Sequence, residues 1–262
     1  MTTDIKFYKY QGAGNDFVLI DNRDLHFDAN NIDLIEKLCD RRFGIGADGL
    51  MLLQNKNNYD FQMLYFNADG KEGTMCGNGG RCIVAFARDL NIIQDHTDFL
   101  AVDGEHTASI DGDQVNLGMI DVAQYHKDGA AFVLNTGSPH YVLFTENLKE
   151  FEVYEQGKAI RNNETYKQDG INVNFIQKEE NGYFVRTFER GVEDETYACG
   201  TGAVASAMSV ALQSNQDGDF NIPIRVLGGQ LEISFTKEKE SFKNVHLKGP
   251  ANLVFQGNWT TN

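Results

Sequence analysis

The chain has 262 residues, 41% of them hydrophobic, and a formal net charge of −15 at pH 7. This acidic balance argues against nucleic acid or an anionic membrane as a partner, because both repel a negatively charged protein. No apolar run has the length of a membrane span, and the start of the chain lacks the basic and apolar regions of a signal peptide. We therefore expect a cytoplasmic protein with no membrane partner, long enough for two ordinary domains.

The first half of the chain alternates short apolar runs with turn residues. Asn31 can cap a helix whose apolar residues share one face, and a second apolar helix follows Cys76. The loop 44–49 is rich in glycine, but it lacks a GK[ST] ending and leads into a strand, which excludes a phosphate-binding loop. The predicted elements are strands over residues 5–10, 17–21, 50–53 and 61–66, helices over 32–39 and after 76, and hairpins over 98–119.

The second half repeats this order. Polar residues 121–128 predict a hinge between two lobes. The elements expected after it are a helix over 153–161, strands over 171–177 and 183–188, a helix after Cys199, and a hairpin over 222–235 that turns at Gly228–Gly229. The tail, residues 252–259, exceeds two full repeats, and we expect it to return to the sheet of the first lobe.

Landmarks recur 123 residues apart, which indicates a duplicated lobe. Cys76 corresponds to Cys199, and Asn15 to Ser138, each before an apolar run. Asn67 corresponds to Arg190, nine residues before its cysteine. A turn or a surface ion pair would explain either residue alone, but their correspondence favours contact with a substrate.

Each cysteine opens a helix beside glycines that leave backbone N–H groups uncovered. Such a helix start attracts an anion and lowers the pKa of a thiol placed there. Buried, inert cysteines would explain one such motif, but two motifs on facing lobes would place a thiol on each side of a substrate. This arrangement could invert a stereocentre. The four cysteines lack zinc-site spacing and have no histidine cluster nearby, so we expect no metal.

The chain resembles the diaminopimelate epimerase family, which consists of pyridoxal-phosphate-independent amino-acid isomerases. The resemblance covers nearly the whole sequence. The segments that carry it are 14–18, 42–48, 66–70, 76–79, 138–140, 189–191 and 196–202.

The resemblance implies conversion of L,L-2,6-diaminopimelate to meso-diaminopimelate, a step toward lysine and peptidoglycan precursors, with no cofactor. It implies that Cys76 and Cys199 are the catalytic bases and that His140 and Glu189 assist them. The implied substrate-binding residues are Gly77, Asn78, Gly200 and Thr201 for the reacting carboxylate, Asn67, Asn172 and Arg190 for the distal end, and Asn15 and Ser138 as further contacts. The family often has Asn at position 138, where this chain has serine, and Gln at position 49, where this chain has glycine, so no role is carried over to Gly49.

The fold implied is α/β (α+β), with two pseudo-symmetric lobes that are each a mostly antiparallel sheet wrapped around a central helix. We expect residues 1–122 with the tail 252–262 to form one lobe, residues 123–251 the other, and the active site to lie in the cleft between them. A homodimer is common in the family. The alternatives are a related racemase that acts on proline or hydroxyproline, a dithiol redox protein and a non-catalytic anion binder.

Overall fold

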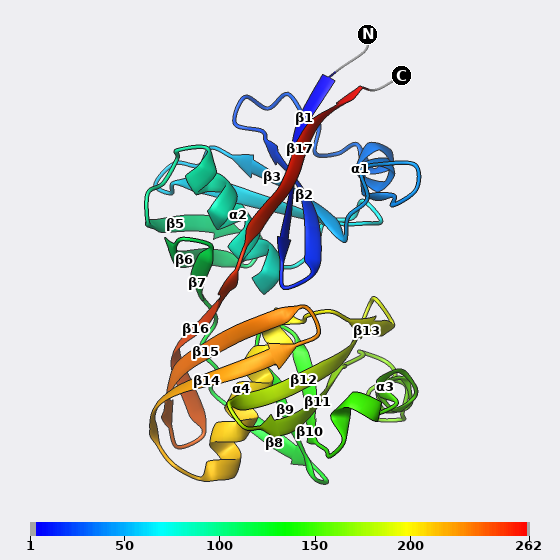
Figure 1. Ribbon diagram of the computed structural model, residues 1–262, viewed down its shortest axis with the longest axis vertical. Helices are drawn as coiled ribbons and strands as arrows, with labels where there is room; N and C mark the ends of the chain where they lie inside the picture. The colour runs from blue at the N-terminus through cyan, green and yellow to red at the C-terminus, as the bar shows by residue number, and fades with distance from the viewer. Residues whose placement is uncertain (1–3, 261–262) are drawn as a thin grey trace. The chain divides into compact units, whose positions relative to one another are not determined.

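The computed structural model describes residues 4–260 (Figure 1). The chain forms two compact units: unit 1 comprises Met1–Leu117 and Pro250–Asn262, and unit 2 comprises Gly118–Gly249. Each unit combines a mostly antiparallel sheet with α-helices, which confirms the predicted fold class.

Unit 1 contains two α-helices and a curved sheet within the described residues. Its elements are β1 (Asp4–Gly12), β2 (Asn15–Asp21), α1 (Ile32–Cys39), β3 (Gly49–Gln54), β4 (Phe61–Asn67), α2 (Gly77–Asp89), β5 (His96–Ala101), β6 (Gly104–Asp111), β7 (Gln114–Gly118) and β17 (Asn252–Thr260).

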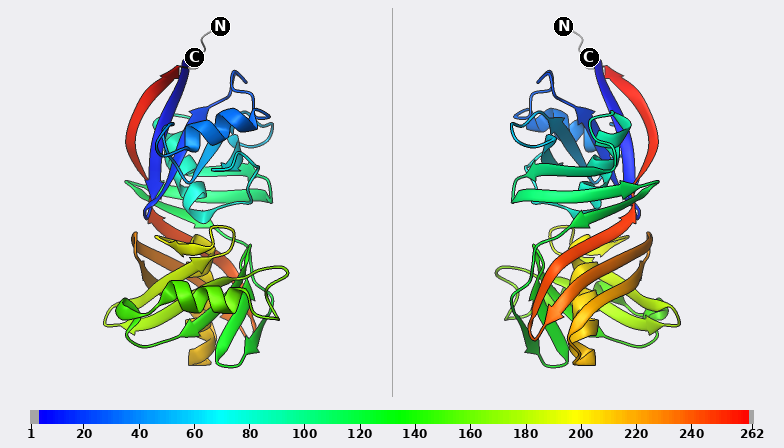
Figure 2. Two further views of the ribbon diagram at one scale, coloured as in Figure 1. Left: turned by 90° about the vertical axis from the view of Figure 1, so that its right-hand side faces the viewer. Right: turned by 90° about the vertical axis from the view of Figure 1, so that its left-hand side faces the viewer.

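The strands of unit 1 pair in the order β17–β1–β2–β3–β4–β5–β6–β7. The C-terminal strand β17 runs antiparallel beside β1, as Figures 1 and 2 show. Among the described strands of unit 1, only the pairs β2–β3 and β4–β5 are parallel. Parallel neighbours need a crossover connection, and α1 and α2 lie in these two connections.

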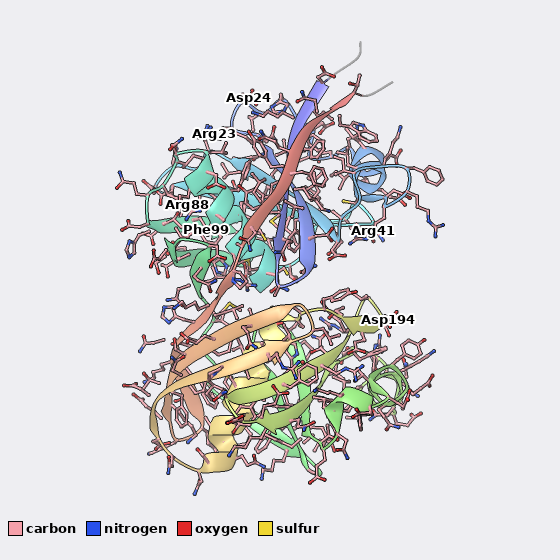
Figure 3. All side chains as sticks on the ribbon, viewed as in Figure 1. Arg23, Asp24, Arg41, Arg88, Phe99 and Asp194 are labelled. Carbon is pink, nitrogen blue, oxygen red and sulfur yellow. The ribbon has the colours of Figure 1, made fainter. Side chains whose placement is uncertain are left out.

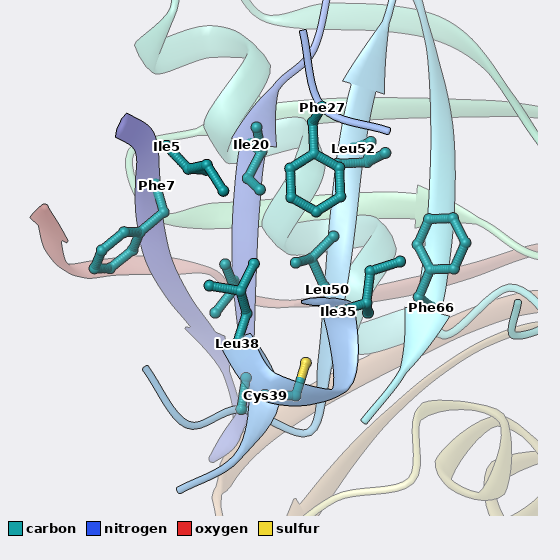
Figure 4. Packing of buried hydrophobic residues seen from close by; sticks show 12 residues of the cluster. Ile5, Phe7, Ile20, Phe27, Ile35, Leu38, Cys39, Leu50, Leu52 and Phe66 are labelled. Carbon is teal, nitrogen blue, oxygen red and sulfur yellow. The ribbon is translucent and has the colours of Figure 1, made fainter. Parts of the chain in front are cut away.

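Helix α1 covers one face of the unit 1 sheet with an apolar stripe. Ile35 and Leu38 are fully buried against strand residues that include Ile20 and Leu50 (Figure 4). The Asn31 side chain accepts a hydrogen bond from the Leu34 N–H, so the predicted cap is present.

Helix α2 packs on the sheet's other face. It is buried continuously over residues 77–87, because β1, β2, β3, β6 and β17 all contact it and the sheet curves around it. The Phe86 ring lies 4.8 Å from the Tyr8 ring and 5.8 Å from the Tyr10 ring. The helix is therefore a core helix rather than an amphipathic surface helix.

Unit 2 repeats this architecture. Its elements are β8 (Tyr125–Asp128), β9 (Ala131–Asn135), β10 (Pro139–Phe144), the 3₁₀ turn η1 (Leu148–Glu150), α3 (Val153–Arg161), β11 (Asn172–Glu179), β12 (Gly182–Glu189), β13 (Asp194–Thr196), α4 (Gly200–Ser214), β14 (Gly218–Val226), β15 (Gly229–Glu238) and β16 (Ser241–Pro250).

The strand pairings of unit 2 match those of unit 1 in order and direction. Strands β8, β9, β10, β11, β12, β14 and β15 follow one another as neighbours, and β16 closes the series. The parallel pairs are again those with helical crossovers, β10–β11 through α3 and β12–β14 through α4. The short strand β13 pairs with β12, where unit 1 has an isolated antiparallel bridge between Phe66 and Glu72 at the equivalent place.

The register of the strands preserves the 123-residue offset. Phe17 pairs with Gly49 in unit 1, and His140 pairs with Asn172 in unit 2, so both partners are shifted by the same 123 residues. The two units therefore place equivalent residues at equivalent positions, and each unit serves as a structural reference for the other.

Two local predictions have clear outcomes. The hairpin is confirmed, because β14 and β15 pair antiparallel from Gly218–Lys237 to Val226–Gly229, but its turn is Leu227–Gly228 rather than the predicted Gly228–Gly229. The hinge prediction is wrong for Tyr125–Asp128, which forms β8 and pairs with β9, where the Tyr125 ring packs near the Phe132 ring. No helix within residues 4–260 is long and apolar enough to cross a membrane.

Candidate active site

The first half-site, which we define as Asn15, Cys76 and Asn78, lies in unit 1 at the start of α2. Cys76 has extended backbone angles and is the N-cap residue, and its carbonyl accepts the first helical bond from Gly80 N at 2.7 Å. The Asn15 Oδ1 atom accepts hydrogen bonds from Asn78 Nδ2 at 3.2 Å and from Cys76 Sγ at 3.6 Å. One amide oxygen thus connects the three predicted residues.

A network of charged side chains fixes the position of the Asn15 amide. Asn15 Nδ2 donates to Asp48 Oδ2 at 2.5 Å. Arg41, in the loop after α1 (Figure 3), donates to both Asp48 and Asp16 at 2.6 Å. Lys9 also pairs with Asp16, at 2.6 Å. Burial acts to raise the pKa of Asp16, but hydrogen bonds from Arg41 and Lys9 outweigh it and hold this pKa well below its ordinary value.

The second half-site, which we define as His140, Cys199 and Thr201, lies in unit 2 at the start of α4. Cys199 is the N-cap residue, and its carbonyl accepts a bond from Ala203 N at 2.9 Å. The Thr201 hydroxyl lies 3.6 Å from Cys199 Sγ and 2.9 Å from His140 Nε2. Both cysteines therefore occupy the same position, one residue before a helix whose first turn is rich in glycine.

Asn172 and Arg190 lie together at adjacent strand ends in unit 2. Asn172 Oδ1 accepts a bond from Arg190 N at 2.9 Å, and Asn172 Nδ2 donates to Pro139 O at 3.2 Å. The Arg190 guanidinium donates to Asp169 O at 2.9 Å. Glu189 is half-buried and accepts a bond from the Thr196 hydroxyl at 2.9 Å. This pair of Glu189 and Arg190 is thus not a simple solvated surface pair.

The remaining predicted site residues are Gly77, Gly200, Ser138 and Asn67, which differ in their burial and backbone hydrogen bonds. Gly77 and Gly200 are buried as the first residues of their helices. Ser138 is half-buried just before β10, and its carbonyl accepts a bond from Thr136 N at 3.1 Å. Asn67 is exposed at the end of β4, where its backbone N–H bonds to Lys71 O rather than joining the Asn15 network.

Tyr65 explains why position 49 carries no side chain. A Cβ atom at Gly49 would lie 2.5 Å from Phe66 O and 2.6 Å from Tyr65 Cε2, and one at Gly73 would lie 2.6 Å from Tyr65 Cε1. Two glycines therefore make the slot for the tyrosine ring. A Cβ at Gly73 would also lie 3.0 Å from Asn67 Oδ1, so this ring lies beside a predicted substrate contact.

Arg81 and Asn174 contact residues of the two half-sites, and the sequence pattern assigned no role to either. Both are fully buried. Arg81 donates to Gly77 O at 3.1 Å and to Asn78 Oδ1 at 3.0 Å, which fixes the start of α2. Asn174 donates to His140 Nδ1 at 3.1 Å. A polar residue at a buried position of an apolar helix or strand was the signal that could have identified each of them.

Cys39 and Cys82 are set apart from the other two thiols by their surroundings. Both are buried, and burial raises the pKa of each thiol to about 12. They are therefore protonated and inert at neutral pH. Residues 4–260 contain no group of three or more His, Cys, Asp or Glu side chains that could hold a metal ion.

Solved structures define the class of fold. A PhzF-family phenazine biosynthesis protein of Bacillus anthracis superposes with a TM-score of 0.78 at 14% identity, over 98% of this chain and 99% of that one. A hydroxyproline epimerase of Agrobacterium vitis gives a TM-score of 0.71 at 11% identity, over 98% and 92% of the two chains. The two-lobed architecture is thus the fold shared by PhzF-type proteins and amino-acid epimerases.

Sequence similarity defines the family within that class. The family model for diaminopimelate epimerase matches residues 7–124 and 132–254. The diaminopimelate epimerase of Flavobacterium psychrophilum is 52% identical over 96% of this chain and 99% of its own, and that of Chlorobaculum tepidum is 40% identical over 95% and 99%. The chain belongs to the diaminopimelate epimerase family, whose members are isomerases.

Proposed function

We propose that this protein interconverts L,L- and meso-2,6-diaminopimelate without a cofactor, in the biosynthesis of lysine and peptidoglycan precursors. The observation that carries the proposal is the duplicated helix start. In each of two matching units a cysteine caps the central helix, and the family match covers both units. A stereocentre is inverted directly when one acid–base group acts on each face of the carbon, and the duplication supplies two.

In this proposal Cys76 and Cys199 exchange the α-proton. The thiolate of one cysteine removes the proton from one face, and the thiol of the other cysteine delivers a proton to the opposite face. The thiolate and thiol are then reversed, so the enzyme can run the reaction in the other direction. The proposal requires both half-sites to close on one substrate, with the active site in the cleft between the lobes.

The developing carbanion needs electrostatic stabilisation, because an amino-acid α-proton is only weakly acidic. Gly77, Asn78, Gly200 and Thr201 begin helices whose backbone N–H groups are suited to hold the reacting carboxylate. Such donors are preorganised, so they need no rearrangement as charge develops. Arg81 supports the first pair by its bonds to Gly77 O and Asn78 Oδ1.

The other predicted residues select the substrate. We propose that Asn67, Asn172 and Arg190 bind its distal end, which explains why only one stereocentre is presented to the thiols. The bond from Arg190 N to Asn172 Oδ1 supports a shared role for these two. Asn15 and Ser138 would contact the substrate at the two matching loops, and His140 and Glu189 would assist the cysteines. A proline or hydroxyproline substrate has no distal amino-acid end and would not need the distal set.

The test is conversion of pure L,L-diaminopimelate by the purified, reduced protein without added cofactor, followed by separation of the isomers. We expect meso-diaminopimelate to accumulate to equilibrium, and we expect no turnover of L-proline or trans-4-hydroxy-L-proline. Turnover of proline in place of diaminopimelate would favour the related racemase. An inactive but folded and reduced protein that reduces disulfides would favour the dithiol redox alternative.

We further propose that the protein acts in the cytoplasm, takes diaminopimelate as its partner rather than nucleic acid or membrane, and works as a homodimer. The four free cysteines support the cytoplasm, the acidic net charge of −15 argues against nucleic acid or an anionic membrane, and the resemblance supports the homodimer. Light scattering after size-exclusion chromatography tests the assembly, since a single species of 29.3 kDa would contradict a dimer.

A further inference from the structure

A chain of hydrogen bonds runs through unit 2 to the sulfur of Cys199. Asn174 Nδ2 lies 3.1 Å from His140 Nδ1, His140 Nε2 lies 2.9 Å from Thr201 Oγ1, and Thr201 Oγ1 lies 3.6 Å from Cys199 Sγ. Asn174 and His140 have no exposed surface. We call this set of four residues the Asn174 relay.

The partners of Asn174 fix the direction of the bond from Asn174 to His140 and of the bond from His140 to Thr201. Its Oδ1 accepts from the Thr187 hydroxyl at 2.9 Å, and its Nδ2 also donates to Tyr141 O at 3.1 Å, so the amide nitrogen faces His140. His140 Nδ1 must then accept, and the ring proton lies on Nε2. Because Nε2 donates to the Thr201 oxygen, the hydroxyl hydrogen of Thr201 is available to Cys199 Sγ, and Thr201 must be the donor once that sulfur is a thiolate, which has no hydrogen of its own.

His140 acts in this relay as a neutral donor. Burial, together with the positive charge of Arg190, lowers the pKa of His140 from its ordinary value to about 3. The ring is therefore uncharged throughout the neutral range, and the tautomer selected by Asn174 is the form that persists there.

Unit 1 shows that the fold does not need this polar chain. The residues 123 positions earlier are Phe17 for His140, Met51 for Asn174 and Asn78 for Thr201. A Cβ atom at Gly79 would meet Met51, and one at the equivalent Gly202 would meet Asn174, so these two side chains cover the same place on their helices. In unit 1 an apolar side chain, Met51, is enough to pack this position of the fold. A role in packing alone therefore does not explain why unit 2 has the polar relay.

We propose that Asn174 is a positioning residue that holds His140 as a neutral donor, so that the Thr201 hydroxyl donates to Cys199 and stabilises its thiolate. A hydrogen bond donated to the charged form of an acid favours ionisation. In the first half-site the bond runs the other way, since Cys76 Sγ donates to Asn15 Oδ1. The use of this Cys199 thiolate as a catalytic base rests on the proposed function, whereas its stabilisation by Thr201 does not.

The charges around this end of α4 are few. The helix itself carries no charged side chain between Gly200 and Ser214. Arg190 and Glu189, at the end of β12, are the charged groups that belong to the predicted site; Arg190 favours a thiolate and Glu189 opposes it. The other charged groups on the strands that pack against α4 have partners of their own or are exposed. The ion pairs are Arg186 with Glu195, Arg225 with Glu179, Lys237 with Asp217, Glu232 with Lys248 and Glu238 with Lys243. Asp219 accepts a hydrogen bond from Thr236, and Lys178 is exposed.

The experiment measures the ionisation of Cys199 directly. In a Cys76→Ala background, the ultraviolet absorbance of the thiolate is followed against pH, and the Cys76→Ala/Cys199→Ala variant provides the baseline. Cys39 and Cys82 stay protonated because burial raises the pKa of each to about 12. The measurement uses no substrate, so it can fail or succeed whether or not the proposed function is right.

Matched variants separate the relay from packing. Thr201→Val keeps the side-chain shape but removes the hydroxyl, and we expect the Cys199 midpoint to rise by about one pH unit. Thr201→Ser keeps a hydroxyl, and its Cys199 midpoint should stay close to that of the parent protein. Asn174→Met copies the unit 1 residue and should shift the midpoint in the same direction as Thr201→Val. Equal midpoints in the parent, Thr201→Val and Thr201→Ser would overturn the inference whether or not Asn174→Met folds. A folded Asn174→Met variant with the midpoint of the parent would overturn it as well.

Discussion

The glycines Gly79 and Gly202 offer a matched test of how the two half-sites are built. They lie 123 residues apart, each in the first turn of its central helix. A Cβ at Gly79 would lie 2.6 Å from Met51 Cε, the end of a flexible side chain. A Cβ at Gly202 would lie 2.3 Å from Asn174 Oδ1 and 3.3 Å from Cys199 Sγ.

The two alanine variants should therefore differ in stability. Gly→Ala inside a helix ordinarily gains about 1 kcal/mol of helix propensity, and both sites share this gain. Met51 can rotate away, so Gly79→Ala should change the free energy of unfolding by less than about 1 kcal/mol. Asn174 is held by Thr187, His140 and Tyr141, so overpacking of about 1–3 kcal/mol adds to the loss of the bond from Thr187 to the displaced Asn174 Oδ1, worth about 1 kcal/mol. Gly202→Ala should be destabilised by about 1–3 kcal/mol net.

The assay is thermal unfolding of the three proteins side by side, with epimerase activity as a second readout. A difference of 1 kcal/mol corresponds to about 2–4 °C in Tm for chains of this size. We expect Gly202→Ala to melt several degrees below Gly79→Ala and to lose more activity, because the shift of Asn174 disturbs His140. A Gly202→Ala protein at least as stable as Gly79→Ala would refute the reasoning.

Three further predictions concern the site. Cys76→Ala and Cys199→Ala should each lower epimerisation by more than the ~10²–10⁴-fold of a single acid–base group, since one base cannot serve both faces; near-normal turnover in either variant would exclude two-base catalysis. Arg190→Met should lower kcat/KM for diaminopimelate about tenfold or more with little change in Tm, as expected for loss of a charged hydrogen bond of about 1.5–3 kcal/mol, whereas an unchanged kcat/KM would remove Arg190 from the distal site. The pKa of Asp16 is lower in the folded protein than in the unfolded chain. The ionised Asp16 therefore stabilises the fold fully at pH values above its pKa in the unfolded chain, and this stabilisation is lost as the pH falls through its pKa in the folded protein. Tm should thus fall less between pH 5 and pH 2 in Asp16→Asn than in the parent, and parallel curves would contradict this.

The duplicated architecture could be predicted because its signals are local. The apolar spacing after Cys76 and Cys199 gives the two central helices, and the 123-residue offset gives the second lobe. The offset survives in the register of strand pairing, where Phe17–Gly49 corresponds to His140–Asn172. These features depend on periodicity and turn chemistry, which a single sequence displays.

The hydrogen-bond networks could not be predicted, because they depend on side chains that meet across strands. Asn174 lies in an apolar strand where only the fold reveals that it faces His140 and Thr187. Arg81 lies on a helix that the sheet surrounds, and its burial follows from that curvature rather than from its neighbours in sequence. The roles of the predicted site residues remain predictions, and catalysis is what tests them.

Isotope incorporation during the first turnover tests the two-base claim most directly. L,L-diaminopimelate is incubated with the reduced, cofactor-free protein in deuterium oxide, and substrate and product are analysed at low conversion. Two thiols that act on opposite faces predict meso product with deuterium at the inverted carbon and unreacted substrate that is still largely protonated. Product that retains the original proton at that carbon would mean that a single base returns it, and would contradict the account.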